Sequence, residues 1–159
     1  DEKAALSALG AMISTPRSAK RLVNIYRLIK ARLPDDEVER FVEQGNYEIV
    51  AVLLGCLVGF PSESRALFAD IRERAQTSKA RQSATTFTKE FERRFARSDV
   101  KNEMAPMIAA LESVIEDRAI AAKRTAGDYA MWIRAVERYS LEGAFSTAHE
   151  LPPEPPRRT

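Results

Sequence analysis

The side chains with the clearest chemical potential are Arg17, Lys20 and Arg21, which follow Ser14-Thr15-Pro16 in the first turns of a predicted helix. A Ser or Thr followed by Pro is typical of a helix start. Arg17 then lies beside free backbone N–H groups, where the helix dipole favours a phosphate. Its planar guanidinium group can donate hydrogen bonds to two phosphate oxygens at once. The sequence predicts an anion-binding surface here, with a merely solvated basic stripe as the alternative.

The same stretch resembles a segment of a known ATPase family. Residues 14–31 read STPRSAKRLVNIYRLIKA. They are similar to the (S/T)-P-R-x-x-K-R-x-x-N-x-Y-R-L-(I/L)-(K/R) segment of the KAP-type P-loop NTPases, a branch of the STAND ATPases. Two shorter similarities follow, at Gly59-Phe60-Pro61 and at residues 136–143, where Leu141-Glu142 replace the Phe-Arg of the family pattern.

The resemblance implies that residues 1–145 form the helical lid or C-terminal domain that follows the core of a bacterial, cytoplasmic ATPase, of a kind often found in defence. It implies that Arg17 is a sensor arginine facing nucleotide phosphates, supported by Lys20 and Arg21, while Asn24 and Arg27 lock the helix to its neighbours. ATP and Mg would be cofactors of the parent protein only. The ATPase core of the same chain would be the first partner of this domain.

Other sequence patterns argue against a catalytic or metal centre within the chain. There is no Gly-x-x-x-x-Gly-Lys-[Ser/Thr] loop to hold a triphosphate. One cysteine and one histidine cannot form a zinc site. Cys56 lies in an apolar run and is predicted to be a buried small hydrophobe, far in sequence from His149. The carboxylates of residues 35–37 follow Pro34 and indicate a helix start.

The composition is that of a globular protein. Of 159 residues, 45% are hydrophobic and 30% are charged, and the net charge of +2 argues against a nucleic-acid partner. No apolar run reaches the roughly 20 residues of a membrane span, so no membrane partner is expected. A single cysteine fits a reducing compartment. Because the chain starts at Asp1 without Met, we expect it to be part of a longer protein.

Helical periodicity dominates the chain and predicts an all-α fold of six to eight short helices in an orthogonal array or bundle. Residues 77–86 are polar, predict a loop or a frayed helix end, and mark a possible subdivision. Pro106 is expected in the first turn of its helix. A Pro-rich tail, 146–159, is expected to be disordered. The predicted helices cover 3–13, 16–33, 37–43, 47–59, 63–76, 87–95, about 100–122 and 129–139.

A protein-interaction module without a nucleotide role is the alternative function. Its partner surface would be the aromatic helix with Phe87, Phe91 and Phe95, or the last helix. Phenylalanines at four-residue spacing are also the expected pattern of a helix packed into a core. Burial of these rings would therefore favour the core interpretation.

Overall fold

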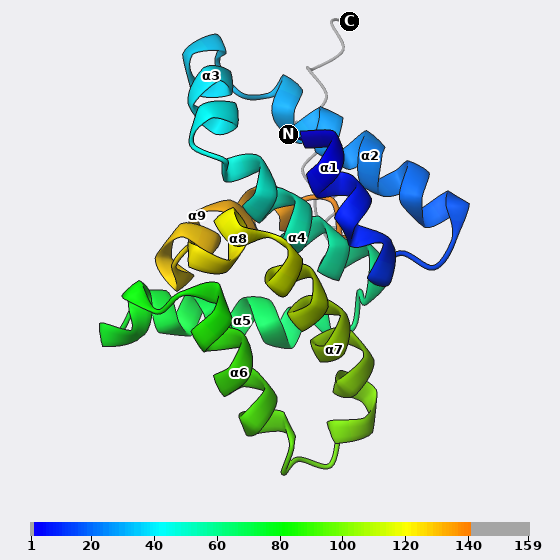
Figure 1. Ribbon diagram of the computed structural model, residues 1–159, viewed down its shortest axis with the longest axis vertical. Coiled ribbons are helices and arrows are strands. Elements are labelled where there is room, and N and C mark those ends of the chain that lie inside the picture. The colour runs from blue at the N-terminus through cyan, green and yellow to red at the C-terminus, as the bar shows by residue number, and fades with distance from the viewer. Residues whose placement is uncertain (1, 141–159) are drawn as a thin grey trace, which may run out of the picture.

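The structure is a computed structural model that describes residues 2–140, which form helices joined by short turns and contain no named strand (Figure 1). The predicted all-α fold is confirmed. Seven α-helices have nine or more residues, and two shorter ones and two 3₁₀-helices join them. The predicted tail, 146–159, lies outside the described residues. The elements are α1 (Glu2–Ser7), η1 (Ala8–Ala11), α2 (Pro16–Ala31), α3 (Asp35–Glu43), α4 (Asn46–Gly59), α5 (Ser64–Ala75), η2 (Ser78–Arg81), α6 (Ala84–Phe95), α7 (Lys101–Asp117), α8 (Ala119–Lys123) and α9 (Ala126–Glu137).

Helix α4 is the centre of the hydrophobic core, as its all-round apolar sequence predicts. Every residue from Tyr47 to Val58 is buried. Helices α1, α2, α3, α7, α8 and α9 all contact α4, and α5 in turn packs against α9. In Figure 1, α4 passes through the middle of the molecule, α2 lies along one side of it, and α6 and α7 form a hairpin at the other end.

The turn between α3 and α4 sets the two helices at 85° to each other. Gly45 makes this turn with a φ of 71°, the left-handed region that side chains rarely adopt. In the range 2–140, no single helix is long and apolar enough to cross a membrane. Only α3 and α4 taken together, as one segment with a bend between them, have the length and composition of a membrane span.

Helix α4 also approaches η1 closely at its C-terminal end. A Cβ atom on Gly59 would lie 2.2 Å from the carbonyl oxygen of Met12, which is backbone and cannot rotate away. Only glycine therefore fits at this contact. The contact with Met12 is thus sufficient to explain a glycine at position 59, independently of the Gly59-Phe60-Pro61 similarity described above.

One carboxylate is buried in the otherwise apolar α4. Glu48 is 2% exposed, and its side chain accepts hydrogen bonds from the Arg118 guanidinium and, at 2.9 Å, from the backbone N–H of Ala121. A buried charge is tolerated when it is paired and hydrogen-bonded. This contact joins the first turn of α4 to α8.

Several predicted helix boundaries need correction. The helix expected over 3–13 is α-helical only to Ser7 and continues as η1 to Ala11, and the helix expected over about 100–122 is interrupted at Arg118, between α7 and α8. Residues 77–86 are not one loop, because η2 lies within them and α6 begins at Ala84, capped by the Ser83 side chain. Pro106 lies beyond the first turn of α7, where its missing N–H would have bonded only to the carbonyl of the exposed Asn102. Helix α9 begins at Ala126, because Thr125 and Asp128 form a capping box.

The aromatic stripe of α6 faces the core. Phe87 and Phe91 are 1% and 0% exposed, and Phe95 packs against the core at its edge. The Phe87 ring meets the edge of Tyr129, in α9, with 5.3 Å between centroids. These rings are therefore core residues, and the aromatic face of α6 is not an exposed partner surface.

Glu112 gives the α6–α7 hairpin a pH-dependent contact. Partial burial raises the pKa of the Glu112 carboxyl, and Glu92 across the hairpin and Glu116 raise it further. The folded chain thus binds this proton more tightly than the unfolded chain. The protonated side chain stabilises the fold below the ordinary glutamate pKa of about 4.3, and that stabilisation is lost as pH rises through the raised pKa.

We expect the Glu112→Gln variant to be more stable than the parent chain at pH 7 by up to about 1 kcal/mol, the range of exposed charge pairs. The advantage should disappear near pH 3, below the ordinary glutamate pKa of about 4.3, where Glu112 is protonated in both states. Urea unfolding at the two pH values measures it. Glu39→Gln, at an exposed site on α3, is the control and should show no such difference. An equal gain at both pH values would contradict the role of Glu112 ionisation.

Candidate functional site

Helix α2 starts as its sequence predicts. Pro16 occupies the first turn, and the Thr15 hydroxyl accepts a hydrogen bond from the backbone N–H of Ser18 at 3.1 Å. Leu22, Ile25 and Tyr26 are buried against the core. The buried face fixes the rotation of the helix, so its basic side chains point to the other side.

The predicted phosphate-binding residues Arg17, Lys20 and Arg21 come together around one shallow depression of about 430 Å³, with Asn24 and Tyr139 beside them. Arg21 donates a hydrogen bond to the backbone carbonyl oxygen of Tyr139 at 3.2 Å. Arg17 and Lys20 are exposed and form no ion pair or hydrogen bond within residues 2–140. No carboxylate lines the depression, so its positive charge is uncompensated there.

Arg27 and Asn24 are also exposed and form no hydrogen bond with the rest of the described chain. Arg27 lines a different depression, where α1 contacts α2. There the Glu2 carboxylate accepts hydrogen bonds from Tyr26 and from Lys30 Nζ, the latter at 2.8 Å. Burial alone would raise the pKa of Glu2, but these partners together hold it below its ordinary value. In this structure Tyr26 and Lys30, and not Arg27, hold α2 against its neighbour α1.

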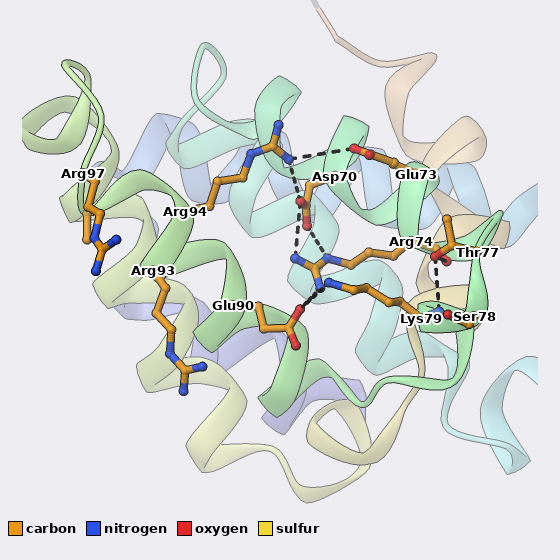
Figure 2. A pocket seen from close by; sticks show the side chains of 11 residues that line it. Asp70, Glu73, Arg74, Thr77, Ser78, Lys79, Glu90, Arg93, Arg94 and Arg97 are labelled. Atoms are coloured by element: carbon orange, nitrogen blue, oxygen red, sulfur yellow. Dashed lines mark hydrogen bonds and ion pairs between the residues drawn. The ribbon is translucent and has the colours of Figure 1, made fainter.

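A second, larger site lies between α5, η2 and the C-terminal half of α6. It is a groove of about 880 Å³, lined by five cationic and three acidic side chains. Figure 2 shows Arg93 on α6 and Arg97 in the turn after it at one side, Thr77 and Ser78 at the other, and Arg74, Lys79 and Glu90 between them. This groove was not among the sites predicted from the sequence.

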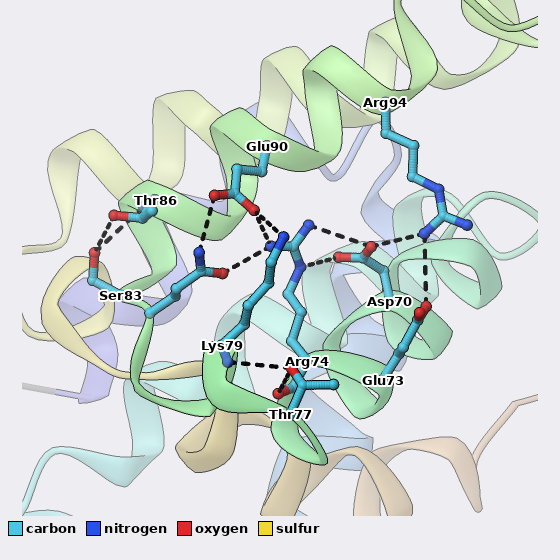
Figure 3. Close-up of polar contacts among 10 residues, drawn as sticks. Asp70, Glu73, Arg74, Thr77, Lys79, Ser83, Thr86, Glu90 and Arg94 are labelled. Carbon is cyan, nitrogen blue, oxygen red and sulfur yellow. Dashed lines mark hydrogen bonds and ion pairs between the residues drawn. The ribbon is translucent and has the colours of Figure 1, made fainter.

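Arg74 is the centre of the ion-pair network on the floor of the groove (Figure 3). Its side chain is 8% exposed, and its Nε lies 2.5 Å from Asp70 Oδ2. The Nη1 atom lies 2.6 Å from Glu90 Oε2 and 2.8 Å from Gln82 Oε1. Arg74 therefore joins α5 to α6 and to the segment between them.

Two further cations complete the network. Arg94 Nη1 lies 3.0 Å from Asp70 Oδ1, and Lys79 Nζ lies 3.1 Å from Glu90 Oε2. The hydrogen bonds from Arg74 and Lys79 lower the pKa of Glu90 to about 2. Burial alone would lower the pKa of Arg74, but its bonds to Asp70 and Glu90 raise it overall. Arg74 and Glu90 are therefore both charged at neutral pH.

The remaining candidate groups within residues 2–140 form no catalytic arrangement. Cys56 is fully buried, and burial raises the pKa of its thiol to about 12, so the predicted inert core cysteine is confirmed. His149 lies outside the described residues. The carboxylates at 35–37 are exposed in the first turn of α3, as a helix start requires, although Pro34 and not an aspartate occupies the cap position. Among residues 2–140, no three side chains are grouped to hold a metal ion.

Comparisons with known proteins add no relatives to this description. No protein-family model matches the chain, no curated protein is significantly similar to it, and no solved structure significantly matches its fold.

Proposed function

We propose that this chain is the helical lid region of a P-loop ATPase of the STAND/KAP type, and that Arg17, Lys20 and Arg21 contact the phosphates of a nucleotide held by the ATPase core. The observation that carries the proposal is the grouping of these three cations, without a carboxylate, around one depression at the capped start of α2. The residue pattern of 14–31 supports it by its similarity to that family.

The geometry of α2 suits a switching role. The inner face of the helix is buried, and Arg17 and Lys20 stand on its exposed side, available to a surface outside the described chain. A phosphate that contacts these side chains in only one arrangement of lid and core would favour that arrangement. Hydrolysis and release of the nucleotide would then remove the contact. A cytoplasmic location is part of this proposal, because the nucleotide would come from that pool.

The test is an Arg17→Ala variant of the parent protein that joins this domain to a P-loop core. We expect ATP turnover to fall by about tenfold to a thousandfold, the effect of removing one positioned charge or hydrogen-bond donor from a transition state. Arg27→Ala, which removes an exposed arginine from the same helix, is the matched control and should keep turnover close to that of the parent. Turnover and nucleotide affinity unchanged by Arg17→Ala would contradict the sensor assignment.

Two simpler observations bear on the same proposal. The sequence upstream of Asp1 should contain a phosphate-binding loop within about 200–400 residues, the usual span of one or two domains. The 159-residue chain alone should show no ATP turnover and only weak ATP binding in calorimetry. Tight ATP binding by the chain alone would point to an independent nucleotide site and against the lid interpretation.

A further inference from the structure

We propose that the groove between α5, η2 and α6 binds an acidic peptide segment of a partner protein. This inference does not rest on the proposed ATPase role, because the groove shares no residue with the α2 surface. Three features carry it: an excess of positive charge, two arginines without partners, and a floor held rigid by buried ion pairs.

The positive charge of the groove exceeds its negative charge by two, since five cationic side chains face three carboxylates. The carboxylates of Asp70 and Glu90 already have two cationic partners each, namely Arg74 with Arg94, and Arg74 with Lys79. The groove therefore has more cationic groups than its own acids can satisfy. An acidic ligand would correct this imbalance.

Arg93 and Arg97 are the side chains left for such a ligand. Both are exposed and line the groove, and neither has an ion pair or hydrogen bond within the part of the chain that the structure describes. They are four residues apart: Arg93 is on α6, and Arg97 is in the turn that follows it. A carboxylate beside either guanidinium would accept a bidentate hydrogen bond from it.

The floor of the groove is already ordered without a ligand. Arg74 is buried and bound on both sides, and Arg94 is fixed by Nη1 contacts to Asp70 at 3.0 Å and to Glu73 at 3.8 Å. Groups that are held in place before binding lose less conformational entropy when a ligand arrives. The network thus orders Arg74 and Arg94 on the floor of the groove before a ligand arrives, and leaves Arg93 and Arg97 free to contact it.

The shape and chemistry of the lining favour a peptide over other anions. A groove of about 880 Å³ is far larger than a single phosphate requires. No aromatic side chain lines it, so bases would have no ring on which to stack, and its three carboxylates would repel a continuous phosphate backbone.

The test measures binding of a fluorescein-labelled decapeptide of alternating Glu and Ser to the 159-residue chain by fluorescence anisotropy at low salt. We expect saturable binding that weakens as salt is added. The Arg93→Glu/Arg97→Glu variant should reduce the affinity at least tenfold. The matched control is Arg134→Glu/Arg138→Glu, which makes the same charge change on two exposed arginines with the same spacing in and beside α9. This control should keep the affinity within about twofold, because surface charges beyond a Debye length are screened.

Three results would overturn the proposal. The first is no saturable binding of the decapeptide by a chain whose helical circular dichroism is intact. The second is an equal loss of affinity in both double variants, which would show general attraction to positive charge. The third is tighter binding of a ten-nucleotide oligothymidine at the same arginines, which would make the groove a nucleic-acid site. Because all four arginines are exposed, the variants are expected to fold, and an Arg93→Gln/Arg97→Gln variant provides a milder second measurement.

Discussion

Replacing Phe91 with alanine is expected to lower the free energy of unfolding by about 3–5 kcal/mol, the usual cost of removing a buried phenylalanine ring. Phe91 is 0% exposed, and its ring packs 4.6 Å, between centroids, from Phe95 at the end of the same helix. The loss combines the transfer of apolar surface with the cavity left between α6 and its neighbours. Urea unfolding followed by circular dichroism measures it directly.

Lys89→Ala, an exposed change two residues earlier in α6, is the matched control and should shift stability by less than about 0.5 kcal/mol. Phe91→Asp goes further, because it places an unpaired charge in the core, and the chain is expected not to fold. A folded Phe91→Asp chain that had lost only a binding partner would contradict the core assignment. That result would instead favour the alternative prediction that the aromatic face of α6 binds a partner.

Replacing Arg74 with methionine is expected to cost about 3–5 kcal/mol, because it leaves the carboxylate of Asp70 buried without its closest counter-charge. Asp70 is 5% exposed in its side chain, and Arg94 alone would then compensate it. Glu90 keeps Lys79 and Gln82 and should suffer less. Urea unfolding at pH 7 is the measurement, and the Asp70→Leu/Arg74→Met double variant should recover most of the loss.

The control for Arg74 is Arg40→Met on α3. Arg40 also pairs with an aspartate four residues earlier, Asp36, but at 3.7 Å and with both side chains more than half exposed. An exposed pair of this kind contributes about 0.3–0.5 kcal/mol, so the control should change little. Equal effects of the two variants would show that burial of the Arg74 network does not govern its energy.

Acid should also weaken the network. The ion pairs of Glu90 stabilise the fold at pH values above the unfolded-state pKa of Glu90, and this contribution is lost as pH falls towards about 2.

The elements that could be predicted from the sequence are those determined by residues close together in the chain. The start of α2 depends on Thr15 and Pro16 alone, and the burial of α4 follows from a run of apolar residues with no polar face. The grouping of Arg17, Lys20 and Arg21 likewise needs only helical spacing. The division near residues 77–86 and the role of Arg17 toward a nucleotide remain predictions.

The groove between α5 and α6 depends on contacts between segments that are separate in the sequence. Asp70 and Arg74 are four residues apart on α5, and that spacing is a local signal of an ion pair within one helix. Their burial, however, requires Glu90 and Arg94 from α6, which only the tertiary fold brings there. Sequence periodicity reports which face of one helix is polar, and it carries no information on which second helix will cover that face.

The position of α9 has a consequence for how the chain is made. Helix α9 packs against both α4 and α5, yet it is the last helix in the described range. A ribosome that has finished α4 must still add residues 60–125 before α9 begins, which takes roughly 3–13 s at 5–20 residues per second. During that interval α4, one of the most apolar helices of the protein, lacks its packing against α9. Chaperones that recognise exposed apolar segments have time to bind it.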